Sequence, residues 1–200
     1  MNPNEEEKFN QLYMKAMEER PEQFVSPSMP YVKCKVNGIE VLALIDSGSM
    51  ITCTNLDLAE RCGFVDEIDT RVKIPVVGVG NKVSIGQNYG VNIQFDDNEI
   101  IIPITIIDIS LFDCDLIIGL DLFNSYRANI NFQENKLILN SVNSIIKVDL
   151  LDETQKNKFV QIKRLIEISN NRLQEEEAVA YLEKNNNNFD TTVNEIISLL

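Results

Sequence analysis

The spacing of apolar residues divides the 200-residue chain into three parts. Residues 5–19 carry apolar side chains three and four positions apart, which predicts one amphipathic helix ending before Pro21. Residues 31–148 show short apolar or alternating runs, a pattern typical of β-strands. We therefore expect an N-terminal helix and linker over 1–30, a β domain over 31–148 and a helical unit over 152–200.

The central part predicts a mainly β fold. Two runs, 31–36 and 39–45, flank Asn37-Gly38, which is the strongest two-residue hairpin signal. Two short helices are expected within the β part, at about 55–62 and about 122–126. Further strands are predicted at 71–77, 82–85, 90–95, 99–107, 115–118, 128–132, 136–139 and 145–148. So many short strands indicate a closed barrel or a sandwich.

The C-terminal part predicts three short helices, each with one apolar stripe. The stripes are Phe159, Ile162, Leu165 and Ile166; Ala178, Val179 and Leu182; and Val193, Ile196, Ile197 and Leu200. Helices this short bury apolar surface only by packing on one another, so we expect a compact three-helix bundle.

Charge and composition narrow the possible partners. The chain has 31 acidic and 18 basic residues, a formal net charge of -13, so phosphate backbones would repel it and we expect no nucleic-acid partner. The longest apolar stretch, 100–107, contains Pro103 and is far shorter than the roughly 20 residues that span a bilayer, so we expect no membrane partner. The acidic N-terminus lacks the apolar core of a signal peptide. We expect a reduced, soluble protein of the cytoplasm, with the nucleus as a further location.

The side chains available for catalysis are restricted because the chain contains no histidine. Ser-His-Asp and Cys-His catalysis within one chain are therefore excluded, together with His-ligated metal hydrolysis. The four cysteines form no C-x-x-C pair, so we expect no metal and no cofactor. Any hydrolysis would depend mainly on carboxylates, lysines or hydroxyls.

One carboxylate stands in an unusual position. In VLALIDSGSMIT, residues 41–52, an apolar run ends at Asp46-Ser47-Gly48, although a buried strand has little reason to end in an aspartate. Asp-Ser-Gly is the active-site sequence of aspartic proteases, in which two carboxylates about 3 Å apart share one proton. One carboxylate activates water and the other hydrogen-bonds the developing oxyanion. The tripeptide by itself also fits an ordinary strand-ending turn.

Two later segments make the catalytic interpretation more specific. Residues 115–123, DLIIGLDLF, contain an apolar pair before a glycine, and residues 76–86, VVGVGNKVSIG, predict a glycine-tipped hairpin. Together they resemble the retroviral-type (retropepsin) aspartic proteases, whose fold is a closed β-barrel. The resemblance assigns catalysis to Asp46, the active-site loop to Ser47, Gly48 and Ser49, the flap to Gly78, Val79 and Gly80, and the buttress of the loop to Ile117, Ile118 and Gly119. A plain hairpin turn is the alternative to the flap.

The resemblance extends over residues 12–140. YVKCKVNGIEVLALIDSGSMIT, LAERCG, GVGNKVSIG and LIIGLDLFNSYRANINFQENKLIL resemble the eukaryotic DNA-damage-inducible proteases, ubiquitin-shuttle proteins with a retropepsin domain. The C-terminal bundle resembles a ubiquitin-associated (UBA) domain. The resemblance implies an aspartic endopeptidase acting on ubiquitinated proteins in the ubiquitin-proteasome pathway, with ubiquitin as a partner of the bundle.

Three departures from the family pattern matter. After Asp-Ser-Gly the family usually has Ala-Gln-Met-Thr, whereas this chain has Ser49, Met50, Ile51 and Thr52, and we expect Met50 to alter substrate specificity. The family's N-terminal ubiquitin-like domain, with its implied proteasome docking, has no counterpart in these 200 residues. Residues 168–170, Ile-Ser-Asn, replace the Met-Gly-Phe/Tyr loop of UBA domains, so we expect weak ubiquitin binding.

The chain has one Asp-Ser-Gly, but the mechanism needs two carboxylates. Asp121 could supply the second, although its position after Gly119 favours a helix N-cap. We therefore expect a homodimer in which a twofold axis brings together two copies of Asp46. The rival hypothesis is a non-catalytic dimeric ubiquitin-binding adaptor, and a retroelement protease is disfavoured by the C-terminal bundle.

Overall fold

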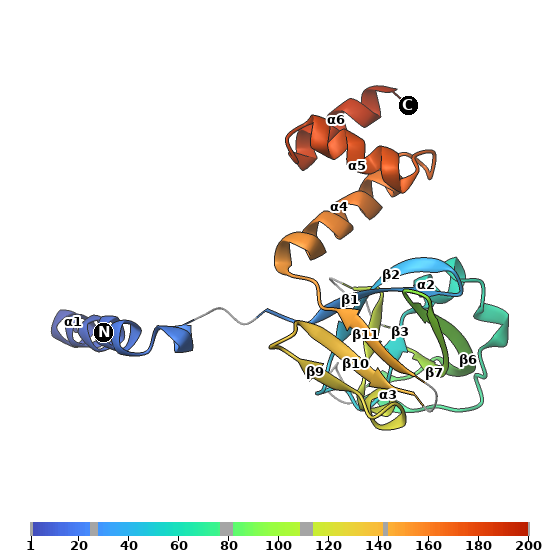
Figure 1. Ribbon diagram of the computed structural model, residues 1–200, viewed down its shortest axis with the longest axis horizontal. Coiled ribbons are helices and arrows are strands. Elements are labelled where there is room, and N and C mark those ends of the chain that lie inside the picture. Colours follow the sequence, from blue (N-terminus) through green and yellow to red (C-terminus); the bar gives the residue numbers. More distant parts are fainter. Residues whose placement is uncertain (1, 25–27, 77–81, 109–113, 142–143, 200) are drawn as a thin grey trace.

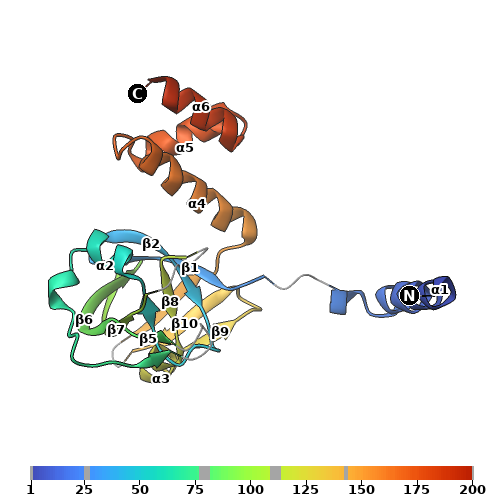
Figure 2. The same cartoon turned by 180° about the vertical axis from the view of Figure 1, so that it is seen from behind.

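The computed structural model of the protein describes residues 2–24, 28–76, 82–108, 114–141 and 144–199. Figure 1 shows helix α1 (Pro3–Glu19), a β-barrel with short helices, and a C-terminal group of helices. In both Figure 1 and Figure 2, α1 lies apart from the barrel, whereas the C-terminal group starts at the barrel surface. These parts follow the changes in apolar spacing along the chain.

The closed barrel has the strand order β1-β2-β8-β3-β7-β6, and β6 pairs with β1 to complete it. The strands are β1 (Tyr31–Val36), β2 (Ile39–Ile45), β3 (Cys53–Thr54), β6 (Gly86–Phe95), β7 (Asn98–Ile106) and β8 (Leu116–Ile118). The predicted β1–β2 hairpin is confirmed: Val36 pairs with Ile39, and Asn37 and Gly38 have φ values of 47° and 85°. Positive φ at both turn positions matches the right-handed twist of the strands.

The barrel core is made by the alternate residues that each strand directs inward. On β2 these are Val41, Ala43 and Ile45, all buried. A second sheet of β9 (Asn129–Asn131), β10 (Lys136–Asn140) and β11 (Ile145–Asp149) adds its apolar face to the same core. Leu150, which follows β11, also belongs to this core.

The prediction was wrong for the strand at 71–77. Among the described residues of this range, 71–76, only β4 (Pro75–Val76) forms, paired with β5 (Lys82–Val83). Residues before Pro75 follow a different path because Asp69 bridges to Gln87 and its carboxylate binds the amide and guanidinium of Arg71. Strand β6 is longer than the predicted 90–95, because the register shift between Asn88 and Val91 lets pairing continue back to Gly86.

The two short helices of the β part are present. Helix α2 (Leu56–Arg61) is capped by Asn55, whose side chain accepts a hydrogen bond from the Leu58 amide at 3.0 Å. It ends before Gly63, which has a φ of 72°. Helix α3 (Leu120–Ser125) starts two residues earlier than predicted, directly after Gly119. Because of this earlier start, Asp121 is the second residue of α3 and does not precede the helix.

The C-terminal helices are α4 (Glu153–Ile168), α5 (Glu175–Lys184) and α6 (Phe189–Leu199). Asp152 and Gln155 form a capping box at the start of α4. The shared core consists of Ile162, Leu165, Ala178, Leu182 and Ile196. Phe159 does not join it, and packs instead with residues of the barrel.

Helix α1 keeps most of its apolar stripe in contact with water. Phe9, Leu12 and Tyr13 are exposed, and the ring of Tyr13 meets that of Phe24 edge-on, with centroids 5.3 Å apart. Phe24 ends the short 3-10 helix η1 (Pro21–Phe24). Within the described ranges, no helix has both the length and the apolar character needed to cross a bilayer.

Candidate active site

Asp46 and the Ile117-Ile118-Gly119 segment lie side by side in the barrel. Strand β2 runs parallel to β8, with Ile45 opposite Ile118, and the Asp46 amide donates to the Ile118 carbonyl at 3.0 Å. The structure thus joins two segments that are about seventy residues apart in the sequence. Because β2 ends at Ile45, Asp46 is the first residue beyond a buried strand.

The loop after β2 holds the Asp46 carboxylate in one orientation. The Gly48 amide donates to Asp46 Oδ1 at 2.8 Å, and the Ser49 amide donates to the Asp46 carbonyl at 3.1 Å. A Cβ on residue 48 would lie 3.1 Å from Oδ1, so glycine permits this close approach. Asp46 is half-buried and Ser47 is exposed. The carboxylate is therefore fixed by its own loop while remaining accessible.

Gly119 supports the same loop from behind. A Cβ at this position would lie 2.4 Å from the Ile51 carbonyl oxygen and 2.9 Å from the Ile51 amide nitrogen, so only glycine fits without movement. The Leu120 amide donates to the Ser49 carbonyl at 2.8 Å, and the Ser49 hydroxyl donates to the Ile51 carbonyl at 2.8 Å. Gly119 and the start of α3 thus contact the backbone of residues 49–51, and the role of Ile117, Ile118 and Gly119 as a buttress stays a prediction.

Asp121 is not the N-cap of α3, so the prediction that it caps this helix was wrong. Gly119 stands at the cap position, and Asp121 is the second residue of α3. Its carboxylate accepts hydrogen bonds from the Thr52 amide at 2.8 Å, the Thr52 hydroxyl at 2.6 Å and the Leu122 amide at 2.8 Å. Both oxygens thus bind backbone or side-chain donors around the loop, and this arrangement anchors the end of the loop to α3.

Thr52 connects this anchor to Gly119. Its hydroxyl donates to Asp121 and accepts a hydrogen bond from the Gly119 amide at 3.1 Å, and Thr52 is 1% exposed. A buried threonine needs partners for both functions of its hydroxyl. Sequence reasoning missed Thr52 because its partners are 67 and 69 positions away, so no local spacing reveals them.

The predicted flap residues Gly78, Val79 and Gly80 lie outside the described residues. The described residues on either side of them, Val76 and Lys82, are paired in the antiparallel ladder of β4 and β5. Beside this ladder the Ser84 hydroxyl accepts a hydrogen bond from the Ile74 amide at 2.9 Å.

An ion pair lies where Asp69 bridges to Gln87. The Arg71 guanidinium binds the Asp69 carboxylate through two contacts of 2.9 Å, and these hydrogen bonds hold the pKa of Asp69 well below its usual range.

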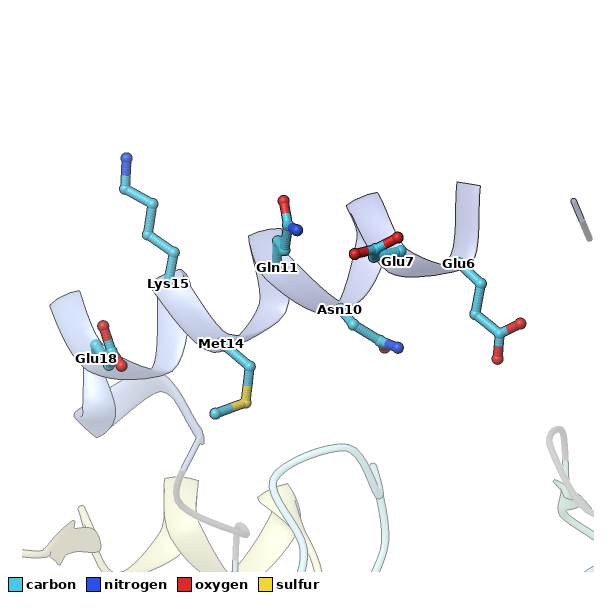
Figure 3. A pocket seen from close by; sticks show the side chains of 7 residues that line it. All are labelled: Glu6, Glu7, Asn10, Gln11, Met14, Lys15 and Glu18. Atoms are coloured by element: carbon cyan, nitrogen blue, oxygen red, sulfur yellow. The ribbon is translucent and has the colours of Figure 1, made fainter. Parts of the chain in front are cut away.

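A shallow hollow elsewhere has no relation to Asp46. Figure 3 shows its lining side chains along a single exposed face of α1, where Met14 stands among polar neighbours. These side chains point outward from one helix and do not converge on a common point. Among the described residues, no group of three or more potential ligands is placed to hold a metal ion.

The closed barrel and the supported Asp-Ser-Gly loop define a retropepsin-like aspartyl protease domain. The family described as "Aspartyl protease" matches residues 21–131, more than half of the chain. The chain belongs to this family, and within it to the DDI1 group of retropepsin-like proteins.

Three similar proteins illustrate the relationship. DNA damage-inducible protein 1 of Phaeosphaeria nodorum is 35% identical over 141 residues, which are 70% of this chain and 30% of that protein. Protein DDI1 homolog 2 of Homo sapiens is 32% identical over 129 residues, 64% of this chain and 32% of that protein. The retroviral protease-like domain of Ddi1 from Leishmania major has a TM-score of 0.56 and 30% identity, covering 64% of this chain and 98% of that one. The match thus spans about a third of the curated relatives' length.

Proposed function

We propose that this protein is an aspartic endopeptidase that acts as a homodimer, with one Asp46 from each chain. The observation that supports this most is the placement of Asp46, fixed by the Gly48 amide and accessible at the end of a buried strand. Asp121, the alternative second carboxylate, is engaged with Thr52 and Leu122. A second copy of the chain, related by a twofold axis, is therefore our proposed source of the missing carboxylate.

In the proposed reaction the two Asp46 carboxylates share one proton. The ionised carboxylate takes a proton from water, which attacks the peptide carbonyl, while the protonated one donates a hydrogen bond to the developing oxyanion. The Gly48 amide, already 2.8 Å from Oδ1, keeps each carboxylate oriented toward the shared axis. Residues 78–80 would cover the substrate as a flap.

We propose ubiquitinated proteins as substrates and the cytoplasm, within the ubiquitin-proteasome pathway, as the place of action. The support is the kinship with DNA damage-inducible protein 1, together with a C-terminal bundle of the size and helix number of a UBA domain. The bundle would bring a ubiquitin-carrying protein to the barrel. Residues 168–170 of the bundle, Ile-Ser-Asn, differ from the Met-Gly-Phe/Tyr loop that is usual in UBA domains, so we expect this binding to be weak.

The test is cleavage of a polyubiquitinated protein by the wild type and by Asp46→Asn. We expect fragments cut within the polypeptide, identified by mass spectrometry, from the wild type alone. Asp57→Asn is the matched control, because Asp57 is an exposed carboxylate paired with Arg61 on α2. An intact substrate after incubation with folded, dimeric wild type would favour the non-catalytic adaptor instead.

A further inference from the structure

The strand that leads to Asp46 has an outer face that is covered by α4. On β2, Val41, Ala43 and Ile45 face the barrel core, so Leu42 and Leu44 lie on the opposite face. Leu42 is nevertheless only 2% exposed. It forms a small apolar cluster with Tyr31 of β1 and Phe159 of α4, and the partly buried Leu44 packs against this cluster.

Phe159 is fixed in this place by the path of the chain. The Leu151 amide donates to the Tyr31 carbonyl at 2.8 Å, and these two residues form an isolated β-bridge. Asp152 follows and caps α4, so little chain separates the end of β11 from the helix. In Figures 1 and 2, α4 rises from the barrel beside β1 and β2. The bundle therefore begins on the barrel and is not joined to it by a long linker.

Two lysine side chains lie over the aromatic rings of the cluster formed by Tyr31, Leu42 and Phe159. Lys156 of α4 is 9% exposed and places Nζ 4.7 Å from the centre of the Tyr31 ring. Lys33 of β1 places Nζ 5.2 Å from the centre of the Phe159 ring and 3.8 Å from Glu175 of α5. Such cation–ring contacts add to the apolar burial and restrict the orientation of both rings.

We propose that α4 braces the strand carrying Asp46, and that Phe159 is a positioning residue for the reaction. Phe159 is connected to Asp46 through β2, since its cluster includes Leu42 and Leu44 and the strand ends one residue before Asp46. A shared site must hold each carboxylate within a fraction of an ångström, about 0.5 Å, so a loosened β2 would misplace it. The effect on catalysis rests on the proposed protease function, whereas the effect on β2 does not.

The experiment compares full-length Phe159→Ala with Ile162→Ala. Ile162 lies on the same helix but packs in the core of the three-helix bundle, so its loss affects the bundle alone. Hydrogen exchange of the β2 amides, residues 39–45, is the readout. Phe159→Ala should speed their exchange by about tenfold or more, and Ile162→Ala should speed exchange within residues 153–199 instead. Unchanged β2 exchange in folded Phe159→Ala would overturn the proposal.

Phe159→Leu keeps much of the apolar contact and covers the case in which Phe159→Ala does not fold. It should give a smaller increase in the same β2 amides, and an equal increase throughout the barrel would count against a local brace. With an active wild type, Phe159→Ala should lower kcat about fivefold or more with little change in KM, and Phe159→Leu should restore most of it. A lower kcat/KM that comes from a raised KM, with kcat unchanged, would exclude a positioning role for Phe159. An inactive wild type would contradict the protease proposal. The hydrogen exchange of the β2 amides would still decide whether α4 braces this strand.

Discussion

The carboxylate of Asp121 binds both polar donors of Thr52, its amide at 2.8 Å and its hydroxyl at 2.6 Å. This pair joins the end of the Asp46 loop to α3, while the Thr52 hydroxyl also accepts from the Gly119 amide. The loop is thus held at its start by β8 and at its end by α3.

Removing either member of this pair should destabilise the fold. We expect Asp121→Asn and Thr52→Val each to lower the free energy of unfolding by about 1–3 kcal/mol. Asp121→Asn removes one of the two carboxylate acceptors of Thr52, and Thr52→Val removes the hydroxyl that binds both Asp121 and the Gly119 amide. Urea denaturation of both variants and the double variant gives a coupling energy, expected at roughly 1–3 kcal/mol. Strictly additive losses would contradict the bond. Where Asp121→Asn remains folded it should keep measurable protease activity, unlike Asp46→Asn.

Gly119 should tolerate no side chain. Even Gly119→Ala would put a Cβ 2.4 Å from the Ile51 carbonyl oxygen, so we expect a loss of about 3 kcal/mol in unfolding free energy. Gly119→Trp should abolish activity. Gly90→Ala is the matched control, since a Cβ there meets only Ile101 Cγ2, at 3.8 Å, and stability should change by less than about 1 kcal/mol. Equal effects at the two glycines would mean that the buttress is placed wrongly.

Mixing wild type with Asp46→Asn tests the shared site. If each site takes one Asp46 from each chain, a mixed dimer has one carboxylate and should activate water poorly. With equal amounts and free exchange, roughly a quarter of the dimers are fully wild type, so activity per wild-type chain should fall by about half. The measurement is the initial cleavage rate at fixed wild-type concentration after long co-incubation.

Two affinity tags must show that subunits exchange in this mixture, because slow exchange would also leave the rate unchanged. A constant rate with proven exchange would refute the shared site. Asp46 and Asp121 of one chain would then have to be reconsidered as the pair.

The buried cysteines should make stability fall in alkaline solution. Burial raises the pKa of Cys53 from 9.0 to about 12 and that of Cys62 to about 11, and it also raises the pKa of Cys34. Above the unfolded value near 9 the unfolded chain loses these protons while the folded chain retains them, so the folded state becomes less stable as pH rises. Between the unfolded and the folded pKa, a buried thiol such as Cys53 contributes a slope of at most about 1.4 kcal/mol per pH unit. Denaturation at about pH 8 and about pH 10 should show a smaller loss for Cys53→Ala than for the wild type.

The C-terminal bundle should bind monoubiquitin weakly. Ser169 stands where the proposed UBA resemblance would place the ubiquitin-contacting loop. It is fully buried, and its hydroxyl donates to the Ile166 carbonyl and accepts from the Arg172 and Leu173 amides. Asn170 follows with a φ of 55°, so the turn offers polar residues where an apolar patch would be needed. Titrating the full chain into labelled ubiquitin should give a Kd above about 1 mM. Tight, saturable binding would show that another surface compensates.

The sequence by itself determined the parts of the protein that depend on neighbouring residues. Asn37-Gly38 specified its hairpin because both positions need positive φ, and three apolar stripes specified three helices through their period. The position of Asp46 at the end of an apolar strand also followed from local order alone. These features could be predicted because their physical causes lie within a few residues.

Only the tertiary structure decided which distant groups meet. Asp121 bonds to Thr52 across 69 positions, although its local setting predicted a helix cap. Phe159 continues a helical stripe that predicted a bundle contact, yet it packs on Tyr31 and Leu42 of the barrel. In both cases the local pattern fixes which face a side chain occupies, whereas its partner depends on how the strands and helices are brought together, and nothing in the spacing of one segment contains that information.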